Sequence, residues 1–411
     1  MSRVQRRAPR WADISQFVAP AFRRDPAGPL GRVRTTADFE RRAARRTPRA
    51  VFEYVSGAAE RETSLRRDRE AFDDVEFLPR VLRDVATVAT GTTVLGKDVS
   101  FPVVLGPTGF TRMMRTEGEP AVARPAGRAG VPYVLSTMGT TSLDELAAAA
   151  PDTDRWFQLY LWRDRGRSQE LLERARDSGI RVLVLTVDVP VAGARLRDAY
   201  NGLTIPPRLS PRTLLDISRH PRWALDALTT APLAFASLGA ASTLEQVINT
   251  VFDPSATLAD IDWLRSRWDG PLVVKGIQRV DDARSVVAAG ADAIAVSNHG
   301  GRQLDRAATP LRLLPDVVDA IGDDAEVYLD GGIRCGADVA VAVAFGARAA
   351  FVARPYLYAL MADGEAGVDH LLALLRTDFS RTLQLLGLTS TTQLGRDVVR
   401  LLPPADRPPS P

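Results

Sequence analysis

The 411-residue chain has one cysteine, Cys335, and only three histidines. A single cysteine excludes an intramolecular disulfide and a cysteine-rich metal site, which fits a reducing cytoplasm. No run of 18 or more apolar residues could span a bilayer, and the N-terminus lacks the apolar core of a signal peptide. The net charge is +3, from 53 basic and 50 acidic residues, so nucleic acid is not an expected partner. These scarcities predict a soluble cytoplasmic protein, with peripheral attachment to the inner face of the cell membrane as the alternative.

What the chain does have is a series of eight short apolar, β-branched runs separated by amphipathic segments. The runs cover residues 101–109, 131–137, 155–161, 182–190, 272–277, 293–298, 326–332 and 349–355. Continuously apolar strands suit a parallel sheet that is covered on both faces. Eight strand–helix units over roughly 250 residues predict an α/β fold, a (β/α)8 TIM barrel, with a doubly wound open sheet as the alternative.

The segments outside this repeat suggest how the chain is divided. We expect residues 1–34 to be an N-terminal arm, residues 35–395 to form the barrel domain, and residues 396–411 to be a C-terminal tail. Helices before residue 100 are predicted to cap one barrel end. A long insertion, residues 200–257, follows the fourth strand, and insertions of this length are usually functional or mobile.

Polar residues and glycines gather at the predicted C-terminal ends of the strands, where active sites of such barrels form. In strand order these are Pro107, Thr108 and Gly109; Ser136; Gln158 and Tyr160; Thr186 and Asp188, with Arg195 beyond; Lys275; His299 and Arg302; Asp330, Gly331, Gly332 and Arg334; and Arg354. A purely structural barrel does not need polar groups at nearly every strand end. The pattern therefore predicts a catalytic or ligand-binding site at this end.

The last two strand ends predict a phosphate site. Gly331 and Gly332 allow backbone N–H groups to approach an anion closely, and Arg334 and Arg354 can neutralise its charge. No G-x-G-x-x-G motif follows a strand, which disfavours a Rossmann-type nicotinamide site.

Three residues nearer the barrel axis suggest what the phosphate belongs to. Lys275 projects from mid-barrel, where an unpaired charge is costly, and is expected to meet an anionic part of a cofactor. Gln158 and Thr186 offer hydrogen bonds suited to the edge of a heteroaromatic ring. Flavin mononucleotide (FMN) has one phosphate and a ring that gains negative charge on reduction, so it fits these positions.

His299 is predicted to be a general base. A neutral imidazole can remove a proton at physiological pH, and Asp188 on the neighbouring rim can stabilise the resulting imidazolium. Arg195 and Arg302 can clamp a carboxylate through planar, bidentate pairs. A base, a carboxylate clamp and a flavin together indicate oxidation of a 2-hydroxy acid.

Several motifs resemble the FMN-dependent 2-hydroxy-acid dehydrogenases and oxidases. These motifs are SNHGGRQLD, LTVDVPVAGARLRD, FQLYLWRDR, PTGF, LVVKGI and DGGIR. The resemblance covers roughly residues 35–395. The stretches RTPRAVFEYVSGAAE, TRMMRTEGE and VDVPVAGARLRDAYNGLTIPP are most similar to the flavin-type L-lactate dehydrogenases of actinobacteria.

The resemblance assigns roles position by position. It implies that His299 is the base and that Asp188 pairs with it. Arg195 and Arg302 become carboxylate ligands, and Tyr54 and Tyr160 become substrate contacts. FMN is placed against Pro107, Thr108, Gly109, Ser136, Gln158, Thr186, Lys275, Asp330, Gly331, Gly332, Arg334, Ala353 and Arg354. The resemblance implies no metal. It does imply a homo-oligomer, which is a tetramer in this family.

The chain departs from the family pattern at three positions. Ala353 replaces a glycine, so a methyl group is expected to crowd the phosphate. Met138 replaces the tryptophan of glycolate oxidase, which predicts a different substrate pocket. Gly109 replaces an alanine that is common in oxidases, and within the family this small residue is associated with dehydrogenases.

The sequence thus predicts FMN-dependent oxidation of an (S)-2-hydroxy acid to the 2-oxo acid, with L-lactate as the first choice and a quinone or other acceptor taking the electrons. One alternative is an oxygen-using oxidase of a larger, mandelate-like or peptide-derived substrate, and another is a non-catalytic binding barrel. Hydride and carbanion routes stay open. In the insertion, Arg212, Arg219 and Arg222 are interleaved with Trp223, Phe235 and leucines, which predicts either a membrane-surface segment or a lid.

Overall fold

The computed structural model describes residues 10–11, 28–202, 210–237 and 251–403. The chain divides into two compact units, residues 1–34 and residues 35–411. Most of the expected N-terminal arm lies outside the described residues, and its described helical element is η1 (Gly28–Arg32). The second unit carries the barrel and all predicted site residues.

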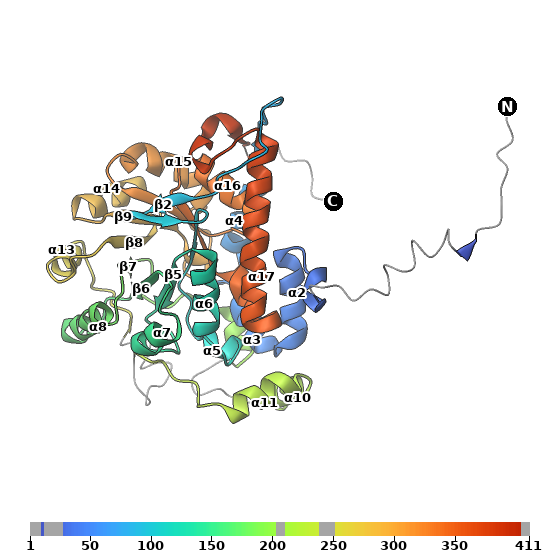
Figure 1. Cartoon of the computed structure of the whole chain (residues 1–411). Helices are drawn as coiled ribbons and strands as arrows, with labels where there is room; N and C mark the ends of the chain where they lie inside the picture. Colours follow the sequence, from blue (N-terminus) through green and yellow to red (C-terminus); the bar gives the residue numbers. More distant parts are fainter. Residues whose placement is uncertain (1–9, 12–27, 203–209, 238–250, 404–411) are drawn as a thin grey trace. The chain divides into compact units, whose positions relative to one another are not determined.

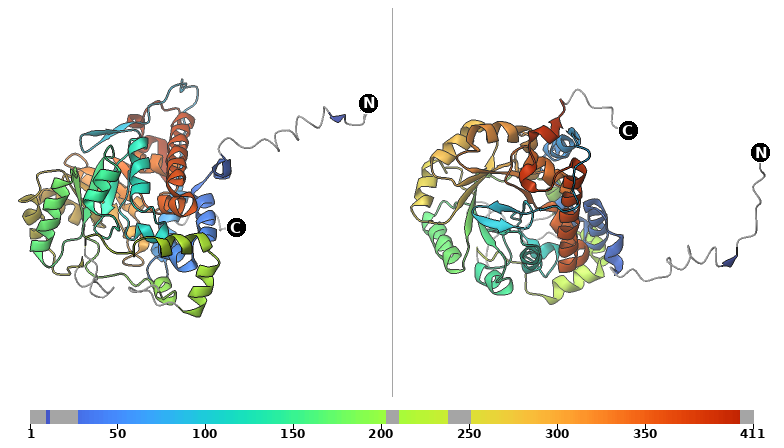
Figure 2. Two further views of the ribbon diagram at one scale, coloured as in Figure 1. Left: turned by 60° about the horizontal axis from the view of Figure 1, so that its bottom comes forward. Right: turned by 45° about the horizontal axis from the view of Figure 1, so that its top comes forward.

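Eight parallel strands close into a barrel, which confirms the predicted fold (Figure 2). They are β4 (Val103–Leu105), β5 (Tyr133–Ser136), β6 (Arg155–Leu159), β7 (Val182–Thr186), β8 (Leu272–Ile277), β9 (Ala293–Ser297), β10 (Glu326–Asp330) and β11 (Ala349–Val352). Each lies inside one of the eight apolar runs. Nearly every strand residue is buried because the barrel interior covers one face and helices cover the other, so the runs show no polar alternation.

Helices follow the barrel strands and surround them (Figure 1). They are α6 (Pro120–Ala129), α7 (Leu143–Ala149), α8 (Arg165–Asp177), α13 (Ala259–Arg265), α14 (Val280–Ala288), α15 (Pro310–Ile321), α16 (Gly336–Ala344) and α17 (Arg354–Leu386). Local capping fixes several starts: the side chains of Ser142 and Asp164 accept backbone N–H groups at the starts of α7 and α8. Helix α17 kinks at Asp363 and Gly364, where the backbone leaves the helical region.

The N-terminal end of the barrel is closed. The rings of Trp156, Tyr328 and Phe351 pack edge to face inside it, with centroids 5.7–6.4 Å apart. The hairpin of β2 (Thr92–Val94) and β3 (Lys97–Val99) adds Val94 and Val99 to this buried cluster. The barrel is therefore a packed core with no pore, and its open end is the C-terminal one.

The helices that precede the barrel in sequence, which were predicted to cap one barrel end, lie at the C-terminal ends of the barrel strands. They are α2 (Thr36–Arg46), α3 (Arg49–Ser56) and α4 (Thr63–Asp73). The backbone N–H of Ala59, between α3 and α4, donates to the carbonyl oxygen of Gly301 at 2.9 Å. Segments that precede the barrel in sequence thus contribute to the mouth where chemistry is expected.

The C-terminal boundary of the domain was predicted wrongly. Residues 396–401, assigned to a tail, form η4 (Arg396–Val398) and β12 (Val399–Leu401), and β12 pairs antiparallel with β1 (Val75–Phe77). The short helix η3 (Thr391–Gln393) precedes them. A three-residue strand is too short to show periodicity, and its partner lies more than 300 positions earlier, so no local pattern marks it. The rest of the predicted tail, 404–411, lies outside the described residues.

The insertion lies between β7 and β8, as expected. Its described helices are α9 (Leu196–Tyr200), α10 (Pro211–Ser218) and α11 (Pro221–Thr229), while 203–209 and 238–250 lie outside the described residues. The indole Nε1 of Trp223 donates to the carbonyl oxygen of Met113 at 3.0 Å, which attaches α11 to α5 (Thr111–Met114). In the ranges that the structure covers, no helix is long and apolar enough to cross a membrane.

Candidate active site

Parallel register aligns the predicted polar positions at the barrel mouth. Ser136 pairs with Gln158 across β5 and β6, and Thr186 pairs with Lys275 across β7 and β8. Asp330 pairs with Ser297, directly before the turn that carries His299. Residues scattered over 190 positions of sequence therefore share one rim.

His299 and Asp188 form a hydrogen-bonded pair. The imidazole Nδ1 lies 2.9 Å from Asp188 Oδ1, and the Asp188 side chain is 1% exposed while that of His299 is 20% exposed. His299 begins the short helix η2 (His299–Gly301) with a left-handed backbone, φ +59°. Gly276 makes room for Asp188, because a Cβ there would lie 2.7 Å from the Cβ of Asp188. The pair predicted from sequence is thus brought together by two unusual backbone positions.

The surroundings of His299 keep its ring neutral. Burial lowers the pKa of His299, and Lys275 and Arg195 act in the same direction, while Asp188 opposes them. Because Asp188 accepts the hydrogen at Nδ1, the lone pair of the neutral ring is assigned to Nε2. This is the protonation state that a general base requires.

Two neighbouring guanidinium groups, those of Arg302 and Arg195, have no carboxylate within 4 Å in the described part of the chain. Arg302 donates from Nη1 to the carbonyl oxygens of Tyr54 (2.7 Å) and Gly57 (3.1 Å), and its guanidinium lies 4.9 Å from the Tyr54 ring centroid. Arg195 Nε is buried without a hydrogen-bond partner among the described residues. Burial, reinforced by Arg195, lowers the pKa of Arg302 to about 10. Two like charges held together in this way are suited to binding an anion.

Aromatic side chains wall this anion site. Burial raises the pKa of Tyr160, so its hydroxyl remains a proton donor, and its ring meets Phe252 edge-on at 5.4 Å. Phe110 contacts both Tyr54, at 6.1 Å, and Phe235, at 4.2 Å. Sequence reasoning missed Phe235 and Phe252 as wall residues; aromatic residues near the end of the insertion were the available signal.

The barrel mouth also contains unsatisfied polar atoms suited to a cofactor ring. Gln158 Nε2 and Thr186 Oγ1 are buried without a partner in the described part of the chain. Gln158 Oε1 accepts from Ser136 Oγ at 2.9 Å, which orients the amide nitrogen. Leaving such a group unsatisfied costs about 1–3 kcal/mol. A ligand with hydrogen-bonding atoms along a ring edge, as FMN has, would satisfy both.

Lys275 already has an acidic partner within the protein, which the sequence did not reveal. Its Nζ lies 2.6 Å from Asp330 Oδ2 and 3.1 Å from Ser297 Oγ. Burial opposes the charged form of Lys275, but Asp330 and Asp188 outweigh it and raise the pKa. Asp330, which is predicted to contact FMN, accepts from Ser297 Oγ and pairs with Lys275 Nζ through its Oδ2. An ion pair formed across three strands depends on register, which sequence does not display.

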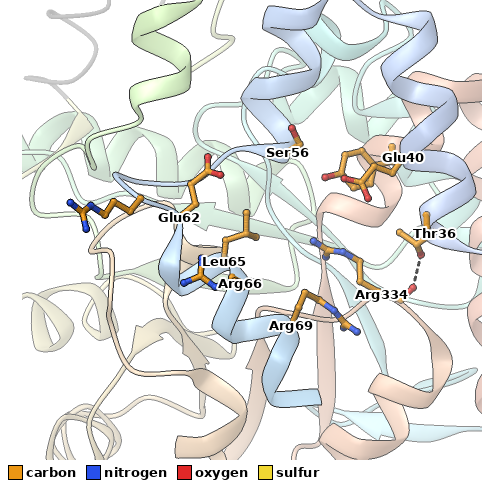
Figure 3. A pocket seen from close by; sticks show the side chains of 11 residues that line it. Thr36, Glu40, Ser56, Glu62, Leu65, Arg66, Arg69 and Arg334 are labelled. Atoms are coloured by element: carbon orange, nitrogen blue, oxygen red, sulfur yellow. Dashed lines mark hydrogen bonds between the residues drawn. The ribbon is translucent and has the colours of Figure 1, made fainter. Parts of the chain in front are cut away.

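The predicted phosphate end lies beside a cavity of about 570 Å³. Figure 3 shows the side chains of Arg66, Arg69 and Arg334 together around it. Burial lowers the pKa of Arg334 to about 10, and no carboxylate of the described residues lies within 4 Å of its guanidinium. Asp338 Oδ2 accepts the backbone N–H groups of Arg334 and Cys335, so these two donors are not free for a ligand.

Arg354 is held in place by backbone carbonyl oxygens. Its Nε donates to the carbonyl oxygen of Val55 at 2.9 Å, and its Nη2 donates to those of Gly57 and Gly300 at 3.0 and 2.9 Å. The side chain therefore joins the N-terminal segment to the His299 turn. Ala353, before it, has φ −122°, so it does not adopt the left-handed backbone that favours glycine.

Gly109 and Met138, the other departures from the family pattern, are coupled by packing. A Cβ at Gly109 would lie 2.9 Å from the Met138 Cβ and 3.3 Å from its carbonyl oxygen. Phe110 N donates to that same oxygen at 3.1 Å, so the two loops are fixed together. Alanine at position 109 would require the Met138 loop to move.

Comparisons with known proteins agree with this geometry. A family model described as FMN-dependent dehydrogenase matches residues 43–401. A Mycobacterium tuberculosis protein provisionally named L-lactate dehydrogenase is 51% identical over 403 residues, 97% of each chain. L-lactate dehydrogenase of Caulobacter sp. is 40% identical over 89% of this chain and 98% of its own.

The chain is also similar to solved structures of enzymes that are named for another hydroxy acid, mandelate. The crystal structure of the monotopic membrane protein (S)-mandelate dehydrogenase has a TM-score of 0.87 and 37% identity, covering 90% of this chain and all of that one. A mandelate oxidase structure with 3,3-difluoro-2-hydroxy-3-phenylpropionic acid has a TM-score of 0.77 and 38% identity, covering 90% and 99%.

Proposed function

Because the chain belongs to the FMN-dependent dehydrogenase family, we propose that it oxidises L-lactate to pyruvate and passes the electrons to a quinone. FMN is its cofactor, and oxidation of an L-2-hydroxy acid is its reaction. One observation carries the proposal: the His299–Asp188 pair lies beside two arginines that have no carboxylate within 4 Å in the described ranges. A substrate with a carboxylate next to a hydroxyl-bearing carbon matches that arrangement.

In this proposal the arginines bind and orient the substrate. Arg195, whose Nε is unsatisfied, and Arg302 hold the carboxylate. Tyr54 and Tyr160 contact the same end of the substrate, with the Tyr160 hydroxyl as a hydrogen-bond donor. The hydroxyl-bearing carbon is then directed toward His299. Orientation of this kind lowers the entropic part of the barrier.

Proton transfer is the task of His299. Its Nε2 takes the proton released when the substrate is oxidised, and Asp188 stabilises the imidazolium through the 2.9 Å hydrogen bond to Nδ1. When bound, FMN supplies the acceptor for the two electrons. In a hydride route His299 would take the hydroxyl proton and in a carbanion route the Cα proton, so it is the base in both.

The proposed placement of FMN is based on the polar side chains at the C-terminal mouth of the barrel. Gln158 and Thr186 meet the ring edge, and Lys275 places a positive charge near it. The backbone of residues 107–109 and Ser136 complete the ring site. Gly331, Gly332 and Arg334 hold the phosphate, with Ala353 and the positively charged Arg354 behind it.

The choice of L-lactate is tested by a substrate panel under anaerobic conditions. We expect the yellow enzyme to bleach with L-lactate and to show a higher kcat/KM for L-lactate than for (S)-mandelate. A cluster of aromatic side chains supports this choice of a small substrate, since Phe110 contacts Tyr54 and Phe235 while Phe252 contacts Tyr160. D-Lactate is the control and should not bleach the flavin. A higher kcat/KM for (S)-mandelate would replace lactate by a larger substrate.

Attachment to a membrane surface is supported by the outer side of the insertion. Leu214 and Leu215 on α10 and Leu225 and Leu228 on α11 are 52–84% exposed. Arg212 on α10, Arg222 on α11 and Arg219 between the two helices are also exposed. Basic residues interleaved with exposed leucines suit an anionic lipid surface. The similar structure of (S)-mandelate dehydrogenase is described as monotopic, which adds support.

The inner side of the same insertion supports the lid interpretation. Phe235 is buried against Phe110, and Trp223 donates to Met113, so these two aromatic residues point to the protein and not to a lipid phase. The insertion can therefore cover the site with one side and contact a membrane with the other. The two roles predicted as alternatives are compatible.

Co-sedimentation with anionic liposomes tests the outer side. Serine at both Leu225 and Leu228 should weaken liposome binding at least tenfold, because burying each leucine contributes about 1.5–3 kcal/mol. Leu385→Ser, which removes another exposed leucine, on α17, is the matched control and should bind normally. Turnover with a quinone analogue should exceed turnover with oxygen. Wild-type protein that stays in the supernatant and reduces oxygen rapidly would contradict both expectations.

A further inference from the structure

Asp68 is a buried acid at the candidate site to which no role has yet been given. It lies on α4, and its side chain is almost completely buried. Its Oδ1 accepts a hydrogen bond of 2.8 Å from Asn298 Nδ2, next to the base. Its Oδ2 is buried without a partner in the described part of the chain. Asp68 Oδ1 is thus hydrogen-bonded to the turn that carries His299, while Oδ2 can still form a hydrogen bond.

The free oxygen faces the predicted phosphate loop. A Cβ built on Gly331 would lie 3.5 Å from Asp68 Oδ2, and one on Gly332 would lie 2.5 Å from the Asp68 carbonyl oxygen. Helix α4 therefore packs directly on the two glycines expected to approach the phosphate. The neighbouring Arg69 reinforces this contact through a 2.7 Å ion pair with Asp338, which follows the loop.

The charges around Asp68 do not hold it in the ionised form. Burial raises the pKa of Asp68 to about 7, and Asp330 on β10 acts in the same direction. The hydrogen bond from Asn298 and the charges of Arg354 and Arg334 lower the pKa but do not compensate. The acid therefore changes protonation near neutral pH.

We propose that Asp68 takes up a proton from solvent when the FMN phosphate binds at the loop of residues 330–334, so that FMN affinity falls as the pH rises. The proposal rests on the proposed placement of FMN. An ionised Asp68 and a phosphate dianion would both lie near Arg334 and Arg354. The two negative charges repel each other, so the state in which both are present is disfavoured. The neutral acid removes this repulsion.

The neutral acid also keeps its structural role. Oδ1 continues to accept from Asn298, whose own Oδ1 accepts the backbone N–H of Gly301 at 3.1 Å and so shapes the turn around His299. Oδ2 gains a hydrogen and becomes a donor toward the loop. Asp68 thereby acts as a positioning residue that links phosphate binding to the turn carrying the base.

The direction of the pH effect follows from linkage. Asp68 has a pKa of about 7 in the free protein, and a nearby dianion raises it. Below pH 7 the acid is already neutral, so binding requires no proton uptake. Above pH 7 binding takes up as much as one proton, and the affinity falls by up to tenfold per pH unit until the higher pKa is reached. The second ionisation of a phosphate monoester lies near pH ~6, so the phosphate contributes little there.

The test compares the FMN dissociation constant between about pH 6 and pH 9 by the fluorescence released from diluted holoenzyme. Wild type should lose FMN affinity above pH 7 with a slope approaching tenfold per unit. Asp68→Asn keeps an acceptor for Asn298 and cannot ionise, so it should bind FMN with a nearly constant affinity and more tightly than wild type at high pH. Asp73→Asn, an exposed acid on the same helix, should behave as wild type.

Two further measurements keep the proposal open to refutation. Calorimetric titration of the wild-type apoprotein with FMN at about pH 8, in buffers of different ionisation enthalpy, should show uptake of a large fraction of a proton. Riboflavin, which lacks the phosphate, should show none. Equal pH slopes in wild type and Asp68→Asn, or no proton uptake, would overturn the proposal. A wild-type protein that binds no FMN at any pH would instead contradict the proposed function.

Discussion

Replacing His299 by glutamine is expected to lower kcat by about 10²–10⁴-fold while FMN stays bound, the range for loss of a general base. Glutamine can still donate to Asp188, which lies 2.9 Å from His299 Nδ1, so the turn should keep its shape. It cannot accept a proton at the position of Nε2. The loss should therefore appear in turnover and leave the flavin absorbance of the purified protein unchanged.

His220→Gln provides the matched control, because His220 lies at the start of α11, in the insertion, and its Nδ1 contacts the backbone oxygen of Asp216. It should turn over normally. The wild-type pH profile adds a second readout: since burial lowers the pKa of His299 below its ordinary 6.5, kcat/KM should fall only as the pH drops through that lowered value. Near-normal turnover of His299→Gln would remove His299 from the base position.

Arg195→Met is expected to reduce kcat/KM between about 30-fold and several thousand-fold, corresponding to roughly 2–5 kcal/mol for truncating one partner of a buried charge pair. Arg302 already donates to the carbonyl oxygens of Tyr54 and Gly57, whereas Arg195 Nε has no partner among the described residues. Arg302 keeps donors on Nε and Nη2, and Arg195 has its buried Nε as well, so Arg195 is the arginine whose loss leaves the fewest structural contacts broken. Methionine preserves much of the side-chain length and removes all of the donors.

The dissociation constant of oxalate measures the same contact without turnover and should rise with the loss in kcat/KM. Arg197→Met is the matched control, because Arg197 lies two positions away and pairs with Glu62 instead. Arg195→Lys should recover part of the binding, since it restores the charge but not the planar fork. Oxalate binding that is unchanged in Arg195→Met would reassign the carboxylate to other residues.

The fold was predictable because its strongest signal is local. Each barrel strand is buried on both faces, so β8 reads as the uninterrupted run LVVKGI and β9 as AIAVS. The pairing of β12 with β1 carried no comparable signal, because the strands have three residues each and lie far apart in sequence. The local sequence pattern therefore identified the barrel strands but not the pairing of β12 with β1.

The site was predictable where a strand end alone determines position. His299 and Asp188 follow β9 and β7, and parallel register carries both to one rim. The partner of Lys275 was not predictable, because Asp330 reaches it across the intervening strand β9. Asp68 escaped notice for another reason: it belongs to a helix before the barrel, and an acid in a charged helical segment resembles a surface residue.

The closed N-terminal end of the barrel restricts exchange of molecules to the C-terminal mouth. Trp156, Tyr328, Phe351 and the β2–β3 hairpin fill the N-terminal end, so we expect the hydroxy acid and the oxo acid both to cross the mouth. Phe235 of the insertion contacts Phe110 on that side. A substitution of Phe235 that changes substrate entry is therefore expected to change product release as well.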